Sequence, residues 1–412
     1  MSQSKHYITP PKLCTGCALC ANVCPKDTIR MRHDKDGFLV PHVDTSACIN
    51  CGLCVKVCPA QPKTLPKVEN TQPFDSITAY GAWHLDKTMQ TASSSGGLFS
   101  ALAEHIFAEK GCVFGVVWQN KTTACYRKAE NMQEIAPMRC SKYVQAIPGY
   151  VYRDVKAELE KGRQVLFVGT SCQVYALQKY LRKPYSGLLT VDIICHGVPS
   201  WNLLSSYIDY VEKKQGHILR NINFRYKDGN WIGYKVQNIF SNGETISEPS
   251  NQNLFMNLFI DGFVLNKCCY ECPHTQLPRI SDITLGDYWG VQFYNTNWPI
   301  RDGISSIVAT TDKGKKTIES LAQKKLIELQ PQNFRKLYNG QPYSYNIRIR
   351  KRAPLGRSNV LAALRTAPLE KVHDTYHNHI KVFGIKIHRN SILAKFAKIP
   401  GKLATLFRKQ LS

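Results

Sequence analysis

The sequence has no long apolar run at any point. No stretch approaches the roughly 18 consecutive apolar residues that a membrane-spanning helix needs, so we expect no transmembrane segment. Residues 1–10 also lack the apolar core of a secretory signal peptide. We therefore expect a cytoplasmic protein in a reducing compartment, where frameworks of disulfide bonds are rare.

Acidic residues are few relative to basic ones, and the imbalance is greatest near the end of the chain. The chain has 54 Lys and Arg against 30 Asp and Glu, for a net charge of +24. Residues 344–412 hold fifteen of these cations and two acids, Glu370 and Asp374. No basic motif with interleaved aromatic residues is present, and net charge alone indicates only general electrostatics. We therefore predict no nucleic-acid partner.

Cysteine is abundant instead: there are sixteen, and eight lie in the first 58 residues. Residues 14–25 and 48–59 both match C-x2-C-x2-C-x3-C-P. A zinc site would instead pair two C-x2-C knuckles around one ion. In bacterial ferredoxins with this run, the fourth cysteine of each copy binds the other cluster. We therefore predict two [4Fe–4S] clusters, one on Cys14, Cys17, Cys20 and Cys58, and the other on Cys24, Cys48, Cys51 and Cys54.

The rest of the chain reads as folded α/β protein. Residues 61–73 contain three prolines and indicate a linker. Strands at 77–83, 112–118 and 124–128 and a helix at 98–109 are expected next. Buried strands at 165–169 and 188–194 then alternate with helices at 174–181 and 201–214, which predicts a parallel pair joined by a helix. Residues 218–246 alternate like antiparallel strands. The fold class is thus multidomain, α+β and α/β: a ferredoxin-like module, a mixed α/β domain with a parallel βαβα unit, and a basic, helical C-terminal tail.

Several segments of the α/β region carry candidate functional residues. The glycines of 93–97 permit close backbone approach to an anion at a helix N-terminus, although a plain capped helix is an alternative. The segments 169–173 and 195–200 follow neighbouring parallel strands, at the edge where α/β sheets bind ligands. Cys172 and Cys195 should therefore lie close together, as cluster ligands or as buried structural cysteines. A C-x2-C knuckle at Cys269 and Cys272 would complete four thiolates.

Residues from about 74 to 330 resemble the beta subunit of coenzyme F420 hydrogenase/dehydrogenase. The segments that carry the resemblance are 93–97, 139–145, 169–173, 195–200, 269–272 and 282–290. The resemblance implies a ferredoxin domain at 1–62, a region like the N-terminal part of that subunit at 74–155, a region like its C-terminal part at 156–335, and a basic tail at 344–412. It also implies FAD and a third [4Fe–4S] cluster.

Carried over to this sequence, the resemblance assigns the site residues. Ligands of the third cluster would be Cys172, Cys195, Cys269 and Cys272. FAD would contact Ser94, Ser95, Gly96, Gly97, Lys142, Tyr143, Gln145, Thr170, Gln173, Gly197 and Ser200. His196 would be a general acid, or would only hydrogen-bond the flavin or the backbone. Cys140 departs from the family pattern, because a small residue, usually glycine, is expected there. Cys112, Cys125 and Cys268 are interpreted as structural.

These residues predict an iron–sulfur flavoprotein oxidoreductase that exchanges electrons between clusters, FAD and a two-electron organic substrate, in polysaccharide or cofactor metabolism. Ferredoxin or another oxidoreductase subunit would be its redox partner. The alternative is a non-catalytic electron-transfer adaptor in a larger complex. In the tail, residues 380–389 and 392–409 mix large apolar residues with lysines. One hypothesis is peripheral contact with the inner face of a membrane; the other is docking on the protein's own body or on a partner.

Overall fold

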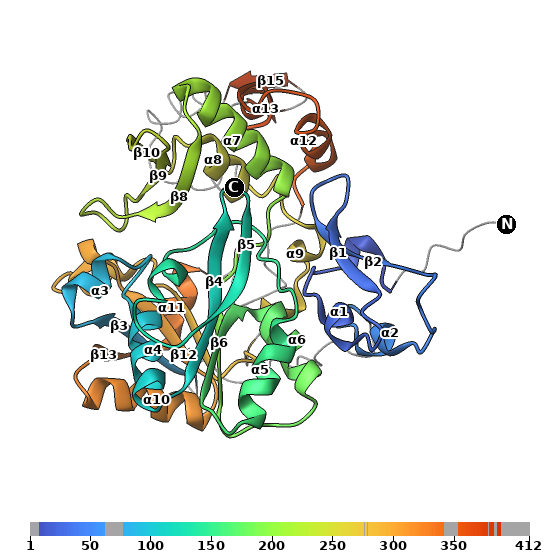
Figure 1. The fold of residues 1–412 in the computed structure, drawn as a ribbon. Coiled ribbons are helices and arrows are strands. Elements are labelled where there is room, and N and C mark those ends of the chain that lie inside the picture. The colour runs from blue at the N-terminus through green and yellow to red at the C-terminus, as the bar shows by residue number, and fades with distance from the viewer. Residues whose placement is uncertain are drawn as a thin grey trace.

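The computed structural model describes residues 8–61, 77–275, 277, 279–341, 353–377, 379–382 and 385–388. A small N-terminal domain lies against one side of a larger mixed α/β body (Figure 1).

The N-terminal domain repeats a short helix that begins one residue before the third cysteine of each run. Its elements are α1 (Leu19–Val23), α2 (Leu53–Val57), β1 (Ile29–His33) and β2 (Leu39–Val43). Each helix follows a residue in the left-handed conformation, Ala18 or Gly52, and each is followed by Cys-Pro, where the helix ends. The antiparallel pair of strands, with Ile29 opposite Val43, connects the two halves.

The body is built on an eight-stranded sheet in the order β13-β3-β12-β11-β7-β6-β4-β5. Its strands are β3 (Thr78–His84), β4 (Cys112–Asn120), β5 (Thr123–Ala129), β6 (Val165–Thr170), β7 (Leu188–Ile193), β11 (Ile283–Asp287), β12 (Ser305–Ala309) and β13 (Ile327–Gln332). The pairs β4–β6, β6–β7 and β7–β11 are parallel, and the other pairs are antiparallel. The predicted parallel pairing of 165–169 with 188–194 is therefore confirmed.

Two apolar cores cover this sheet. Helix α4 (Leu98–Ala108) and helix α10 (Asp312–Gln323) contribute to one core, with Leu102 and Ile318 fully buried. Helix α5 (Val151–Glu160) and helix α6 (Ser171–Leu181) form another with Phe167. Figure 1 shows α5 and α6 between the sheet and the N-terminal domain. The short helices α3 (Lys87–Thr91) and α11 (Phe334–Gly340) lie near the opposite end of the sheet.

The N-terminal domain shares the second of these cores. Cys17 and Leu19 are buried in it beside Tyr152 of α5. The Tyr152 hydroxyl donates a 2.7 Å hydrogen bond to the backbone carbonyl of Cys17, and Asn266 Nδ2 donates one of 3.1 Å to that of Cys14. Apolar burial with satisfied backbone carbonyls holds the cysteine loop against the body.

A three-stranded antiparallel sheet and three helices form the rest of the body. These elements are β8 (Leu219–Tyr226), β9 (Lys235–Phe240), β10 (Thr245–Pro249), α7 (Trp201–Gln215), α8 (Leu254–Ile260) and α9 (Lys267–Tyr270). Their core includes Tyr207, Phe224 and Phe255, together with Phe38 from the N-terminal domain. The antiparallel strands expected within 218–246 are confirmed.

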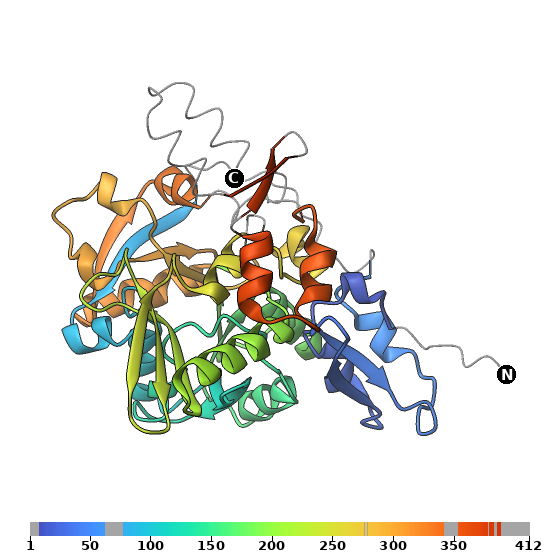
Figure 2. The same cartoon turned by 90° about the horizontal axis from the view of Figure 1, so that it is seen from above.

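The C-terminal segment differs from the expected separate tail. Helices α12 (Arg357–Ala363) and α13 (Leu369–Tyr376) bury Val360 and Val372 in the same core as α7 and α8. An ion pair joins Arg365 to Asp36 of the N-terminal domain. Seen from above, both helices lie beside that domain (Figure 2). Residues 357–376 are therefore part of the body and not an appendage to it.

The basic stretches at the end of the chain are only partly described. Within 380–389, the backbone forms an antiparallel pair, β14 (His379–Val382) and β15 (Ile385–His388), where a helical tail was expected. The amphipathic stretch at 392–409 lies outside the described residues. Among the helices that the structure describes, none combines the length and apolar character needed to cross a membrane.

Candidate functional site

A cavity of about 300 Å³ lies at the carboxyl ends of β6 and β7. Most of its lining residues lie within five segments, 93–99, 138–146, 168–173, 193–198 and 285–287, and Gly115, Val116, Phe259 and Ser305 add to them. Thr15, from the first cysteine loop of the N-terminal domain, also lines it. The edge of the sheet at which parallel strands end is where α/β folds bind ligands, as the sequence indicated.

Most of the predicted cofactor-binding residues line this cavity. Those that do are Ser94, Ser95, Gly97, Lys142, Tyr143, Gln145, Thr170, Gln173 and Gly197, as does His196. Gly96 and Ser200 do not. A Cβ on Gly96 would lie 2.8 Å from the backbone nitrogen of Ser305, so this glycine permits close packing on the sheet. The Ser200 hydroxyl caps α7 and donates to the Asp36 carbonyl, so it joins the two domains.

The 93–97 segment fits an anionic group. Gly97 has φ +89° and caps α4, an eleven-residue helix whose first residues, Leu98 and Phe99, line the cavity. Amides in the first turn of a helix have no partner within the helix, and the helix dipole favours negative charge there. A phosphate of FAD matches these donors.

Two buried cations, Lys227 and Arg225, hydrogen-bond the backbone carbonyls of this segment. Lys227 Nζ donates to the backbone carbonyls of Gln90 and Ser95 at 2.7 and 2.6 Å. Arg225 Nη2 donates to the Ser94 carbonyl at 3.3 Å and to Asp287 Oδ1 at 3.0 Å. Burial lowers the pKa of Lys227 to about 8. Sequence reasoning missed both cations, because no motif marks them and only the folding of β8 and the residue after it brings them to the backbone of the 93–97 segment.

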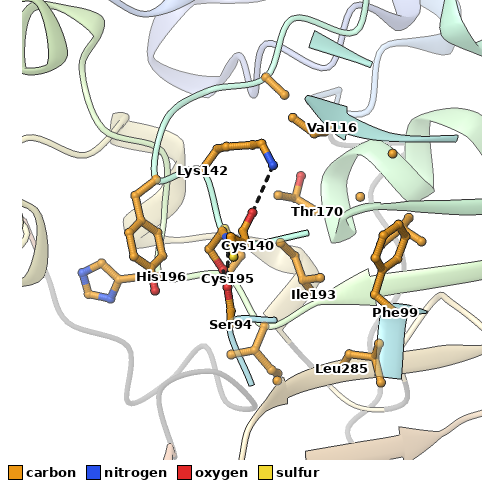
Figure 3. Close-up of a pocket in the computed structure, with 18 of the residues that line it drawn as sticks. Ser94, Phe99, Val116, Cys140, Lys142, Thr170, Ile193, Cys195, His196 and Leu285 are labelled. Atoms are coloured by element: carbon orange, nitrogen blue, oxygen red, sulfur yellow. Dashed lines mark hydrogen bonds between the residues drawn. The ribbon is translucent and has the colours of Figure 1, made fainter. Parts of the chain in front are cut away.

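Lys142 and Cys140 lie together in one wall. The Lys142 ammonium donates to backbone carbonyls that include those of Pro137 and Cys140, at 2.8 and 3.1 Å, and Figure 3 shows it directed at the Cys140 carbonyl. Burial lowers the pKa of Lys142 to about 8. Cys140 has φ +63°, a conformation that favours glycine. This backbone geometry explains why glycine is expected at the position.

The backbone of α8 holds the ring of His196. Its Nε2 lies 3.1 Å from the Phe259 carbonyl, and its ring meets the Phe259 ring edge-on with centroids 5.0 Å apart. A carbonyl oxygen only accepts, so Nε2 carries the hydrogen in this bond. That proton is used to orient the ring.

The cysteines predicted for a third cluster converge on the N-terminal domain. Burial, followed by repulsion from Cys272 and Cys195, holds the pKa of the Cys172 thiol well above its usual value, and Cys17 adds to the repulsion. Cys269 Sγ accepts a hydrogen bond from the Val198 amide at 3.4 Å. All these thiols are free of disulfides, and soft thiolate donors at such a site fit an iron–sulfur cluster.

Cys268 lies within the same group, although the sequence indicated a structural role. Its thiol donates to the Cys14 carbonyl at 3.3 Å. The pKa of Cys268 is raised well above the usual value by its side-chain hydrogen bond with Cys269 and by burial. Repulsion from Cys269, Cys272 and Cys172 raises this pKa further. Five thiols therefore lie near one another and near the first cysteine loop.

The ferredoxin cysteines form two sets with different exposure. Cys14, Cys17, Cys20 and Cys58 are all buried. After burial, repulsion from Cys17, Cys14 and Cys58 raises the pKa of Cys20 well above its usual value, so the fourth cysteine of the second run adjoins the first three. Burial, followed by repulsion from Cys51 and Cys24, raises the pKa of Cys54. Cys51 is exposed, so the second set lies at the surface.

Within the described part of the chain, no three His, Cys, Asp or Glu side chains form a ligand group for one metal ion. A [4Fe–4S] cubane has four iron corners, each bound by one cysteine.

Comparisons with known proteins agree with the two halves of this architecture. Residues 162–333 match the family described as the C terminus of the beta subunit of coenzyme F420 hydrogenase/dehydrogenase, and residues 13–61 match the 4Fe-4S dicluster domain. The predicted resemblance of the N-terminal module to two-cluster ferredoxins is confirmed, and the predicted resemblance of the body to the beta subunit is confirmed over residues 162–333. No curated protein matches the chain. A solved chain of the F420-reducing [NiFe] hydrogenase complex from Methanosarcina barkeri is 16% identical, with a TM-score of 0.44 over 73% of this chain and 92% of that one.

Proposed function

For a chain whose residues 162–333 match the C terminus of the coenzyme F420 hydrogenase/dehydrogenase beta subunit and whose residues 13–61 match the 4Fe-4S dicluster domain, we propose an FAD-dependent iron–sulfur oxidoreductase acting on a small organic substrate. These two matches support an iron–sulfur redox protein in electron transfer. FAD, the third cluster, the site residues and the domain boundaries given above are part of the proposal.

The observation that carries the proposal is the shared wall between the cavity and the first cysteine loop. Thr15, which lies between two predicted cluster ligands, Cys14 and Cys17, lines the cavity beside Lys142 and Gln145. The thiols around Cys172 adjoin the same loop. Redox centres held at these positions would be neighbours, and this proximity is what electron transfer requires.

The residues of the chain would bind and orient the cofactors. The first turn of α4 would receive a phosphate of FAD, and Lys142 would supply positive charge beside the flavin. His196 would fix one wall through its bond to Phe259. Bound FAD supplies the exchange between the single electrons that clusters carry and the two-electron chemistry of an organic substrate.

The test is electron transfer within the isolated, anaerobically purified chain. Protein with oxidised cofactors is mixed with reduced methyl viologen, and the iron–sulfur and flavin absorbance bands are followed by stopped flow. We expect both absorbance bands to bleach. We also expect an organic acceptor to reoxidise the reduced chain, which completes the turnover. A chain without flavin, or with flavin that stays oxidised while the clusters are reduced, would overturn the proposal. Turnover seen only with a co-purified subunit would favour the adaptor.

A further inference from the structure

The second set of ferredoxin cysteines lies next to a basic groove. The groove has a volume of about 330 Å³ and is lined by Leu53, Lys56 and Val57 of α2 and by Lys179 and Arg182 at the end of α6. Helix α2 also carries Cys54, a predicted ligand of the surface cluster. The groove therefore combines an apolar floor, three cations and direct contact with the helix that would hold a redox centre.

The three cations have no carboxylate partner among the described residues, although Lys179 lies over the Tyr175 ring, 5.3 Å from its centroid. Among the ion pairs of the described residues, none involves Lys56, Lys179 or Arg182, and no carboxylate lines the groove. The C-terminal end of each helix attracts a cation through the helix dipole, and Lys56 and Lys179 lie in the last turns of α2 and α6. That effect explains a cation at each end but not why two helices of different domains direct three cations into one groove.

Apolar side chains extend the surface around the same cysteines. Ile49 and Val55, on either side of Cys51 in the sequence, are 56% and 42% exposed. Cys51 itself is exposed, whereas the other set of ferredoxin cysteines is buried against the body. Electrons entering from another protein would thus meet the chain at this edge.

We propose that this basic groove and the apolar surface beside it dock a small acidic electron-transfer protein. The inference rests on the proposed redox function and names the partner's chemistry: a carboxylate-rich face surrounding its own redox centre. Small, transient interfaces are typical of electron-transfer complexes, and complementary charge chiefly raises the rate of encounter. Each encounter transfers one electron: the partner's centre is oxidised by one electron and the chain is reduced by one, without proton transfer.

The test compares two charge-matched variants of the full-length holoprotein. The groove variant is K56Q/K179Q/R182Q. The control, K213Q/R220Q/K316Q, removes three exposed cations that are likewise absent from the ion pairs of the described residues, on α7, β8 and α10. The probes are an acidic [2Fe–2S] ferredoxin, reduced electrochemically, and reduced methyl viologen, which as a small dication needs no docking surface. Rates of reduction are measured at low and high salt.

At low salt we expect ferredoxin to reduce the groove variant at least about tenfold more slowly than the wild type, and the control at nearly the wild-type rate. High salt should remove the difference. Equal rates for wild type and groove variant, or an equal loss in the control, would overturn the docking site; the groove would then hold another occupant, such as residues 62–76 of this chain. Failure of methyl viologen to reduce any variant would instead overturn the proposed redox function.

Discussion

The side chain of Gln145 joins the cavity to the N-terminal domain through the backbone of Thr15. Its Nε2 donates a 2.9 Å hydrogen bond to the Thr15 carbonyl, and its Oε1 accepts one of 3.3 Å from the Leu39 amide. Gln145 also lines the cavity. A single amide therefore ties a predicted flavin contact to the loop that carries Cys14 and Cys17.

Replacing Gln145 with Glu should weaken this connection. The Glu carboxylate cannot donate a hydrogen bond, so the partly buried carbonyl of Thr15 loses its donor and lies next to a negative charge. We expect this loss to lower the free energy of unfolding by about 1–3 kcal/mol. We expect a lower thermal midpoint and slower electron transfer between clusters and flavin, measured by calorimetry and stopped flow. The exposed Gln252→Glu is the matched control. Equal behaviour of the two variants would show that the bond does not matter.

Iron content should separate the cluster sites. Three cubanes correspond to about twelve iron atoms and twelve acid-labile sulfides per chain. The double variant C172S/C272S should lose about four of each and leave the ferredoxin signals in the electron paramagnetic resonance spectrum intact. Cys125 is not a predicted ligand of any of the three clusters, so Cys125→Ser should leave the iron and sulfide content unchanged. About eight iron atoms in the wild type would remove the third cluster, and zinc without sulfide would contradict all three.

Gly97 should be required for flavin binding. An added Cβ would lie 2.9 Å from His84 Cβ, and φ +89° strains any other residue by about 1–3 kcal/mol. Gly97→Ala should therefore displace the start of α4 and reduce the FAD released on denaturation from about one per chain, with the ferredoxin clusters retained. Gly243→Ala has the same kind of φ, +86°, but meets nothing within 4 Å. If both variants keep their flavin, the phosphate site lies elsewhere.

Flavin affinity should depend on pH through Lys142. Burial lowers its pKa to about 8, so the ammonium is charged below this pH and neutral above it. Loss of the charge removes attraction to the anionic cofactor, and the FAD dissociation constant should rise as the pH passes through about 8, by a factor on the order of ten. Lys142→Met should bind more weakly and lack this rise. Lys227 has a similar pKa, but it donates to the backbone carbonyl of Ser95 in the 93–97 loop. If the FAD dissociation constant of Lys142→Met still rises near pH 8, Lys227 and not Lys142 is the titrating group.

Truncation should distinguish the packed helices from the end of the chain. A cut after Ala353 removes Val360, Leu361 and Val372 from the core; each buried side chain contributes about 1.5–3 kcal/mol, so the body should be strongly destabilised. A cut after His377 should leave stability and clusters unchanged. Sedimentation with anionic liposomes at low salt, compared for the full chain and the chain cut after His377, tests the membrane hypothesis. Equal sedimentation of both would contradict it.

Sequence spacing by itself determined the local chemistry of this protein. The cysteine runs at 14–25 and 48–59 predict iron–sulfur ligands, because residues a few positions apart must lie close together in any fold. The alternation of buried strands and helices over 165–214 predicted the parallel unit for the same reason: apolar periodicity is a local property. Because parallel strands end at one edge, it also brought Cys172 and Cys195 together.

Only the tertiary structure decided which distant residues complete the site. Thr15 reaches the cavity because Cys17 and Leu19 are buried against α5 and α6. Arg225 of β8 and Lys227, which follows this strand, hydrogen-bond the carbonyls of Ser94 and Ser95, although they are 131 and 132 residues away in the sequence. The sequence predicted that residues 357–376 belong to a charged tail, yet they form helices that pack in the core. The net charge of a segment does not show which of its apolar side chains will be buried. Such contacts depend on complementary surfaces far apart in the chain, and no local pattern records them.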